Sequence, residues 1–167
     1  MMRTYTLPST PVGLLTLAAD DRDRLCRLEF GEITPRAGVR PDDAVLEGVL
    51  ADTVEQLDEY FAGTRREFDL ELAPQGTSFQ LAVWTALRAI PYGATASYGD
   101  IARAVDRPNA VRAVGQANGR NPIAIVVPCH RVIGSDHSLT GYGGGIERKR
   151  FLLALEGAAA LTPALDL

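Results

Sequence analysis

The sequence predicts a two-part α+β protein: an N-terminal α/β domain over residues 1–76 with a small antiparallel sheet, and a C-terminal helical domain over residues 77–167. Three observations lead to this fold class. Short alternating segments crowd residues 3–30, a helical period follows them, and the second half consists of helix patterns separated by tight turns. Residues 73–76, Ala-Pro-Gln-Gly, are the expected linker between the two parts.

The N-terminal part begins with three expected antiparallel strands. Residues 3–7, 12–18 and 24–30 alternate or run apolar, and turn-forming residues separate them. Residues 32–43 form a loop rich in proline, glycine and charge. A helix is expected over residues 44–62, ended by Gly63, and residues 68–72 are expected to add a strand. The apolar positions of that helix are Val45, Leu46, Val49, Leu50, Val54, Leu57 and Phe61.

The C-terminal part begins with three expected helices. Ser78 is a plausible N-cap for a helix that ends before Pro91, with Phe79, Val83 and Leu87 on its apolar face. Ser97 is expected to cap a short helix that ends near Ala104, and Asn109 a second that ends near Asn118. A helix, a tight turn and a helix form the pattern of a helix-turn-helix, although two packed core helices give the same pattern.

Composition and charge narrow the class of protein. Hydrophobic residues make up 46% and charged residues 23% of the 167, as in ordinary globular proteins. No apolar run approaches the roughly 20 residues that span a bilayer, and the N-terminus lacks a signal-peptide core, so we expect a cytoplasmic protein without a membrane partner. Residues 1–76 carry 8 basic and 15 acidic side chains, whereas residues 77–167 carry 9 and 6. An acidic partner should therefore approach the C-terminal half.

The chain has two cysteines, Cys26 and Cys129, and two histidines. This set does not match any recognisable zinc spacing, and we expect no metal and no cofactor. Cys26 lies in an alternating segment and is expected to be an ordinary strand residue. The two cysteines are not expected to form a disulfide in a cytosolic protein.

The most informative segment is Pro128-Cys129-His130-Arg131-Val132-Ile133. A buried strand is expected over the apolar residues 123–127, and Pro128 should end it, because proline has no N–H to donate. A thiol beside an imidazole can become a thiolate near neutral pH, and the thiolate is the nucleophile. The dipeptide alone also fits an inert buried cysteine.

The surrounding pattern is longer and more specific. Asn121-Pro122, five further residues, Pro-Cys-His-Arg-Val, the glycine-rich residues 141–145 and a helix ending in Glu156-Gly157 follow one another. This sequence resembles the O6-alkylguanine-DNA alkyltransferases, strongly over residues 77–157 and only in size and style before them. The resemblance implies a ribonuclease H-like N-terminal domain and a C-terminal domain with a DNA-binding helix-turn-helix and an active-site strand and loop.

The resemblance also implies a reaction and the residues that perform it. The family repairs DNA by irreversible, single-turnover transfer of an alkyl group from O6-alkylguanine, and probably O4-alkylthymine, to a cysteine, here Cys129. His130 would take the thiol proton through a water molecule, and Glu156 would orient the imidazole. A carboxylate near a helix C-terminus is unfavourable without a partner, which supports this pairing. Asn121 would tie the backbone near the cysteine.

DNA contacts are implied by the same resemblance. O6 of guanine is stacked inside the duplex, so the base must flip out to reach a buried thiol. Arg112 would fill the vacated place, and small residues such as Ala113 and Ala117 would allow a close approach from the minor groove. Tyr98 would crowd the 3′ phosphate and donate to guanine N3.

The guanine pocket is expected to form around the active-site loop. Tyr142 would wall it, and backbone N–H groups near Tyr142 and Gly143 would donate to O6. The carbonyls of Val132 and Cys129 would accept from the exocyclic amine, and Lys149 matches a family lysine near the loop. Position 143 is glycine where relatives often have serine, so a backbone donor survives and a side-chain donor does not.

Two other functions remain open from the sequence. A lesion sensor that binds alkylated DNA without reacting would share the DNA-binding residues, but the binding-only relatives replace the cysteine by tryptophan. A cysteine hydrolase would use Cys129 on esters or peptides without DNA. We expect a monomer that acts on double-stranded DNA containing O6-alkylguanine.

Overall fold

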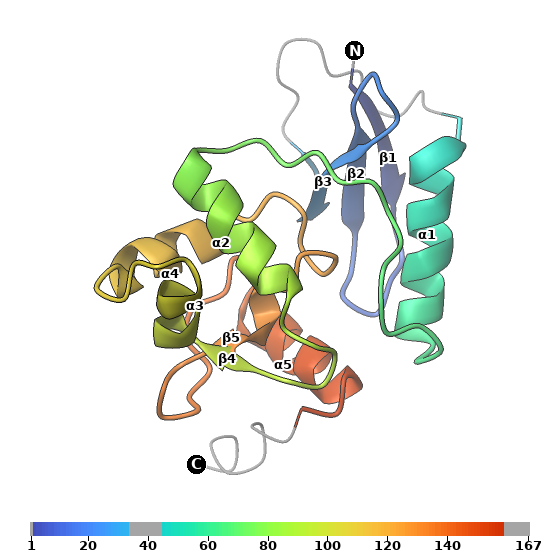
Figure 1. Cartoon of the computed structure of the whole chain (residues 1–167). Coiled ribbons are helices and arrows are strands. Elements are labelled where there is room, and N and C mark those ends of the chain that lie inside the picture. Colours follow the sequence, from blue (N-terminus) through green and yellow to red (C-terminus); the bar gives the residue numbers. More distant parts are fainter. Residues whose placement is uncertain (1, 34–44, 159–167) are drawn as a thin grey trace. The chain divides into compact units, whose positions relative to one another are not determined.

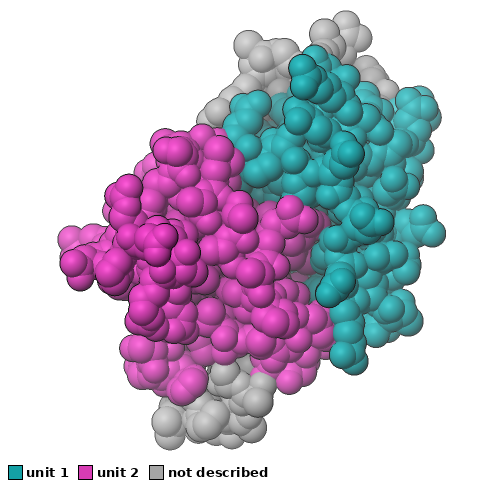
Figure 2. Space-filling model, in the orientation of Figure 1, with its two compact units in different colours: residues 1–75, 122–124 teal, residues 76–121, 125–167 magenta. Residues whose placement is uncertain are grey.

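The computed structural model describes residues 2–33 and 45–158, and the chain divides into two compact units. Unit 1 comprises residues 1–75 and 122–124, and unit 2 comprises residues 76–121 and 125–167 (Figure 2). The units are therefore not two consecutive halves of the chain. Within the described residues no helix has both the length and the apolarity needed to cross a membrane.

Unit 1 is built on a three-stranded antiparallel sheet in the order β1-β2-β3, with helix α1 alongside it (Figure 1). The strands are β1 (Arg3–Leu7), β2 (Leu15–Ala19) and β3 (Leu25–Phe30), which confirms the three predicted strands. Strand β2 begins three residues later than expected. The hydroxyl of Thr10 donates to the Gly13 carbonyl and accepts from the Val12 N–H, which holds residues 10–13 in a turn.

The strand predicted over residues 68–72 is wrong, apart from one isolated bridge between Leu72 and Leu25. The side-chain amide of Gln56 forms hydrogen bonds with both backbone groups of Asp69. It donates to the Asp69 carbonyl at 2.9 Å and accepts from the Asp69 N–H at 2.8 Å. A side chain therefore supplies the hydrogen bonds that a neighbouring strand would otherwise make.

Residues 122–124 pair with the same edge of β3. The Leu28 N–H donates to the Pro122 carbonyl, and the Ala124 N–H donates to the Leu28 carbonyl, both at 2.9 Å. Ile123 forms an isolated parallel bridge with Leu28. The segment that leads toward Cys129 thus starts from a fixed backbone position.

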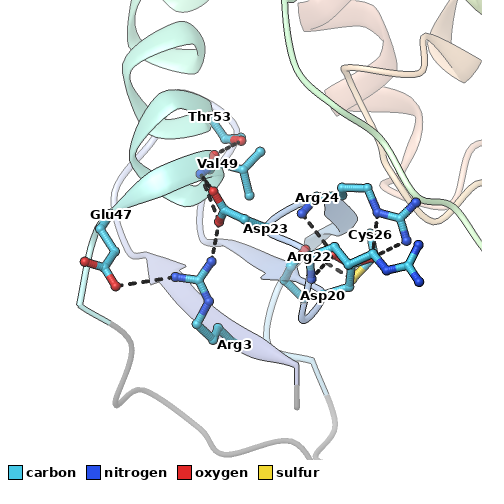
Figure 3. A network of polar contacts seen from close by, with 10 residues as sticks. Arg3, Asp20, Arg22, Asp23, Arg24, Cys26, Glu47, Val49 and Thr53 are labelled. Atoms are coloured by element: carbon cyan, nitrogen blue, oxygen red, sulfur yellow. Dashed lines mark hydrogen bonds and ion pairs between the residues drawn. The ribbon is translucent and has the colours of Figure 1, made fainter.

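Helix α1 (Gly48–Phe61) starts four residues later than the predicted range of 44–62. Val45 is 72% exposed and precedes the helix. The start is set from outside the helix: the carboxylate of Asp23, in the turn between β2 and β3, accepts from the Val49 N–H at 3.2 Å and pairs with Arg3 (Figure 3). Its buried residues are Val49, Leu50, Thr53, Gln56, Leu57 and Tyr60.

Unit 2 contains the three predicted helices α2 (Ser78–Arg88), α3 (Tyr98–Ala104) and α4 (Val111–Gly119). Thr77, not Ser78, caps α2 through a capping box with Gln80, and Ser97 caps α3 as predicted. The prediction that Asn109 caps α4 is wrong, because the N-cap position is Ala110 and no side chain caps it.

The three helices pack against one another. The Trp84 indole N–H of α2 donates to the Ala117 carbonyl of α4 at 2.9 Å, inside the core. This core fixes the position of the α4 C-terminal end, from which the chain runs toward the nucleophile. Its main buried side chains are Val83, Trp84, Leu87, Ile101, Ala102, Val114 and Ala117.

The apolar run 123–127 is buried as expected, but it is not a strand. After the bridge at Ile123 the chain turns, and Ile125 has φ +70°, a left-handed value that is unusual for a β-branched residue. A short 3-10 helix, η1 (Cys129–Arg131), follows, and β5 (Val132–Ile133) pairs in parallel with β4 (Ala96–Ser97). The turn replaces a strand because only the start of the run has a backbone partner.

Helix α5 (Ile146–Leu155) closes the fold, with Glu156 at its C-cap. The sequence predicts an inner face of Ile146, Phe151, Leu152 and Leu155 for this helix, but only Leu152 is fully buried, and Phe151 is 38% exposed. Lys149 and Leu153 are buried instead. The helix is therefore rotated so that a cation, not an aromatic ring, lies at the centre of its inner face.

We predict that Asp23→Ala lowers the free energy of unfolding by about 1–2 kcal/mol. The alanine removes the acceptor for the Val49 N–H, and it loses the short polar side chain that makes φ +59° tolerable for an aspartate or asparagine. Asp23→Asn keeps an acceptor and tolerates this φ, so it should cost less than about 0.5 kcal/mol. Urea denaturation measures both. Equal losses in the two variants would show that the charge of Asp23, and not its capping oxygen, stabilises the fold.

Candidate active site

Cys129 lies at the start of η1 and is only 5% exposed. Its backbone N–H donates to the Val127 carbonyl at 2.8 Å, which tightens the turn around Pro128. Because the segment is a helical turn and not a strand, Cys129, His130 and Arg131 are all buried together. In an extended segment, the side chains of Cys129 and His130 would instead point to opposite sides.

The Cys129 thiol is neutral in the resting protein. Burial raises its pKa, and this effect outweighs hydrogen bonds from Asn121 and Tyr142 and the positive charge of Lys149, which act in the opposite direction. A thiol of raised pKa does not ionise by itself near neutral pH. Ionisation needs a base that takes the proton during the reaction.

His130 and Glu156 form a fully buried pair, with 2.7 Å between Nε2 and Oε1. Burial tends to raise the pKa of Glu156, but hydrogen bonds from His130 and Arg131 lower it to about 2. The carboxylate is therefore ionised and can only accept, so Nε2 of the imidazole carries the hydrogen. Burial also lowers the pKa of His130.

The other imidazole nitrogen, Nδ1, is buried and has no hydrogen-bond partner among the described residues. In this tautomer Nδ1 holds a free lone pair, so it can accept a proton. The structure thus brings together a neutral thiol, a neutral imidazole with an accepting nitrogen, and a carboxylate that fixes the tautomer.

Sequence reasoning missed Arg131, which is the second partner of Glu156. Its Nε donates to Oε2 at 2.8 Å and its Nη2 to Oε1 at 2.9 Å, a bidentate pair. Its Nη1 donates to the Ile90 carbonyl at 2.7 Å, and the guanidinium lies 5.8 Å from the centre of the Tyr92 ring. The unfavourable carboxylate at the end of α5 was the signal that more than one donor was needed.

Two asparagines tie the end of α4 to the nucleophile turn. Asn121 Nδ2 donates to the Val127 carbonyl at 2.8 Å, and Asn118 Nδ2 donates to the Cys129 carbonyl at 3.3 Å. Asn118 is 4% exposed and was expected only as the end of a helix. The sequence offers only an asparagine near the end of a helix, which is common before turns, so it gave no signal for this contact.

Lys149 is the only lysine of the chain and is fully buried. Its Nζ donates to the carbonyl of Val132 at 2.6 Å and to that of Thr140 at 3.2 Å, and burial lowers its pKa to about 8. Of the two carbonyls expected to bind guanine, that of Val132 therefore already accepts from Lys149, and that of Cys129 accepts from Asn118 Nδ2 and from the Val132 N–H. A carbonyl oxygen has two lone pairs, so that of Val132 can accept another hydrogen bond, whereas both lone pairs of the Cys129 carbonyl are already engaged.

The residues expected to contact DNA lie on α3, α4 and the loop before α5. The Tyr98 hydroxyl is 2.7 Å from the Thr140 hydroxyl, which connects α3 to this loop. Arg112 and Ala113 are exposed on α4, and Arg112 makes no hydrogen bond or ion pair within the described residues. Ala117 is 3% exposed and does not reach the surface, so its expected part in the close approach is wrong.

The glycine-rich loop is only partly exposed. Tyr142 is half-buried, and Gly143 is exposed. No group of three or more His, Cys, Asp or Glu side chains in the described part of the chain is arranged to hold a metal ion.

Comparisons with known proteins agree over most of the chain. Residues 78–158 match the model of the 6-O-methylguanine DNA methyltransferase DNA-binding domain, and residues 3–74 match that of its ribonuclease-like domain. The chain is 52% identical over 158 residues to the methylated-DNA–protein-cysteine methyltransferase of Mycolicibacterium paratuberculosis, with 93% of both chains covered. It is 47% identical over 154 residues to that of Methanosarcina acetivorans, with 92% of this chain and 98% of the relative covered.

Solved structures show the same similarity. Mycobacterium tuberculosis OGT in complex with DNA aligns with a TM-score of 0.83 and 53% identity, over 96% of this chain and 98% of that chain. The O6-methylguanine methyltransferase structure from the same organism aligns with a TM-score of 0.81 and 51% identity, over 94% and 93%.

We predict that Lys149→Met lowers the free energy of unfolding by about 1–3 kcal/mol, because the buried carbonyls of Val132 and Thr140 lose their donor. Amide hydrogen exchange over residues 134–145 should also quicken. Phe151→Met, on the exposed side of the same helix, is the matched control and should change stability by less than about 0.5 kcal/mol. If both variants unfold at the same denaturant concentration, the ammonium does not hold the loop.

Proposed function

Because this chain belongs to the 6-O-methylguanine DNA methyltransferase family, and is therefore a DNA-repair enzyme that binds DNA and transfers alkyl groups, we propose that Cys129 is its acceptor. The observation that carries this proposal is the site itself. Cys129 is a buried thiol on the same turn as an imidazole whose Nδ1 can accept a proton. Cys26, the other cysteine, donates to the Ala18 carbonyl within unit 1 and has no such neighbour.

The proposed step is a displacement at an sp³ carbon. The Cys129 proton passes to His130 Nδ1 through a water molecule, and the sulfur forms a bond to the alkyl carbon. The bond between that carbon and O6 breaks, and its electron pair stays on guanine. Guanine then takes up the proton that His130 received from the thiol. The product is a thioether, which nothing in the site is equipped to hydrolyse, so each molecule reacts once.

The electrostatics of the site support this order of events. A thiol of raised pKa is protected from reaction until a base is in reach. Glu156 stabilises the imidazolium that forms, and the positive charge of Lys149 favours the thiolate. His130 acts as general base, and Glu156 and Asn121 act as positioning residues.

We propose O6-alkylguanine in double-stranded DNA as the substrate and O4-alkylthymine as a second one. The reactive atoms are buried, so the base must leave the duplex. The exposed Arg112, without a partner among the described residues, suits the role of filling the gap, and Ala113 beside it permits a close approach from the minor groove. Tyr98, the first residue of α3, would contact the 3′ phosphate of the DNA and donate to guanine N3.

The flipped guanine is proposed to bind beside the glycine-rich loop. Tyr142 would wall the pocket, and backbone N–H groups near Gly143 would donate to O6. The carbonyl of Val132 would accept from the exocyclic amine with its second lone pair, beside the bond from Lys149. The carbonyl of Cys129 would accept from the same amine in place of one of its present donors, Asn118 or the Val132 N–H. A glycine at 143 leaves this pocket without the hydroxyl that relatives often supply.

We further propose that the protein acts in the cytoplasm as a monomer, with its DNA-binding and reactive residues all in the part from residue 77 onward. A lesion sensor that only binds would need no buried acceptor thiol, whereas this chain keeps Cys129 with its full set of partners.

We predict that Cys129→Ser abolishes transfer but leaves DNA binding intact. Incubation of the wild-type protein with O6-methylguanine duplex should add the mass of one methyl group, and peptide mapping should place it on Cys129. Cys26→Ser is the control and should react like the wild type. Methyl transfer by Cys129→Ser, or a label on Cys26, would assign the acceptor elsewhere.

We predict that Arg112→Ala slows repair of duplex DNA about tenfold or more but hardly changes the reaction with free O6-benzylguanine, provided the pocket admits that ligand. A free base needs no extrusion, whereas unstacking in a duplex costs a few kcal/mol. Arg120→Ala removes an equal exposed charge from the end of the same helix and should have a smaller effect on duplex repair. Equal losses on both substrates would assign Arg112 to the pocket or the fold.

A further inference from the structure

We propose that Arg131 is a positioning residue that holds His130 in the neutral form with Nδ1 free to accept a proton, by pairing with Glu156. This inference rests on the proposed role of His130 as the general base. It adds to the site a residue, Arg131, that received no role from the motif and that need not touch the substrate.

The geometry makes Arg131 the main ligand of the carboxylate. Both oxygens of Glu156 accept from the guanidinium, at 2.8 and 2.9 Å, and Oε1 also accepts from His130 Nε2 at 2.7 Å. The side chain of Glu156 is fully buried, and that of Arg131 is 8% exposed. Oε1 is therefore shared between a permanent cation and the imidazole, and water does not screen the three groups.

Two further groups besides Glu156 contact the guanidinium of Arg131. Its Nη1 donates to the Ile90 carbonyl at 2.7 Å, and its plane lies near the ring of Tyr92. The Tyr92 hydroxyl in turn donates to the Leu155 carbonyl at the end of α5, at 3.2 Å. Arg131 thus connects η1 to the turn after α2 and to the C-terminus of α5.

The charges around His130 show what this pair does. Cys129 and Arg131 belong to its own turn, and Glu156 and Lys149 approach from α5. Burial lowers the pKa of His130, Glu156 raises it, and the positive charges of Arg131 and Lys149 lower it. Arg131 balances the carboxylate, so Glu156 can orient the imidazole without drawing a proton onto it.

Without Arg131, the buried carboxylate would lose its permanent counter-ion. A lone buried carboxylate is costly, so the His130–Glu156 pair would take up a proton at a higher pH than in the wild type. If that proton resides on the imidazole, both ring nitrogens carry hydrogen. If it resides on Glu156 and is donated to Nε2, the ring hydrogen moves to Nδ1. In both arrangements Nδ1 can no longer accept from the thiol.

The test measures the protonation of His130 directly. The chain has only two histidines, so nitrogen-15 imidazole spectra of the whole protein contain His130 and the exposed His137, which serves as an internal reference. Spectra are recorded from pH 5 to 9 for the wild type, Arg131→Met and Arg131→Lys. Arg150→Met, which breaks an exposed pair with Glu147 on α5, is the matched control.

In the wild type and in Arg150→Met, His130 should remain the neutral Nε2–H tautomer at pH 7. In Arg131→Met its signals should move to the protonated form or to the other tautomer at pH 7, with a midpoint raised by at least about one pH unit. Arg131→Lys keeps the charge but loses the bidentate geometry, so its midpoint should rise by at least about half a unit. If Arg131→Met does not fold, Arg131→Lys alone decides.

Reaction with free O6-benzylguanine supplies the second readout. Arg131→Met should react at least about tenfold more slowly at pH 7 and recover most of that loss at pH 9, because the extra proton is then removed. A purely structural role would lower the rate equally at every pH. An unchanged His130 titration in a folded Arg131 variant, or a loss independent of pH, would overturn the proposal. His130→Ala in the same assay tests the general base separately, since wild-type rates there would remove the base and not the effect of Arg131 on the imidazole.

Discussion

The shared carboxylate of Glu156 is the interaction on which the arrangement of unit 2 around the nucleophile depends. Three elements meet there: the C-terminus of α5 supplies the carboxylate, η1 supplies both His130 and Arg131, and the turn after α2 supplies the Ile90 carbonyl. A buried charge is tolerated only when every oxygen has a donor, so these elements have little freedom to shift. The reactive turn is consequently held by ion pairs and hydrogen bonds in addition to apolar packing.

The single lysine of the chain, Lys149, differs from the arginines in a way that suits its position near Cys129. All sixteen other basic residues are arginines, yet the cation beside Cys129 is Lys149. An arginine stays charged at any accessible pH, whereas a buried lysine titrates, here with a pKa of about 8. A compact ammonium also fits between two backbone carbonyls that a planar guanidinium would force apart. Arg131, which is always charged, pairs with the ionised Glu156. Lys149, which can titrate, lies near Cys129, the group that ionises only during the reaction.

Local pattern predicted the elements whose signals are local, and failed where distant residues decide. Ser97 was predicted to cap a helix and residues 3–30 to form three strands from adjacent residues alone, and both predictions are confirmed. The start of α1 depends on Asp23, and the lost strand at 68–72 depends on Gln56, each far away in sequence. At the site, the motif gave Cys129, His130 and Glu156 as neighbours. Arg131 and Asn118 remained hidden because their partners are backbone carbonyls and a carboxylate that only the fold brings near.

The pairing of residues 122–124 with β3 has a consequence for how the protein could be divided. These three residues belong to unit 1, and two backbone hydrogen bonds with Leu28 hold them. Directly after them comes Ile125, whose left-handed backbone persists only where its surroundings impose it. A fragment that began at the linker would contain every proposed reactive residue, yet it would lack the edge strand against which this segment is held. The backbone groups of residues 122 and 124 would then lose their partners on Leu28, so a cut at the linker separates this segment from the strand that holds it.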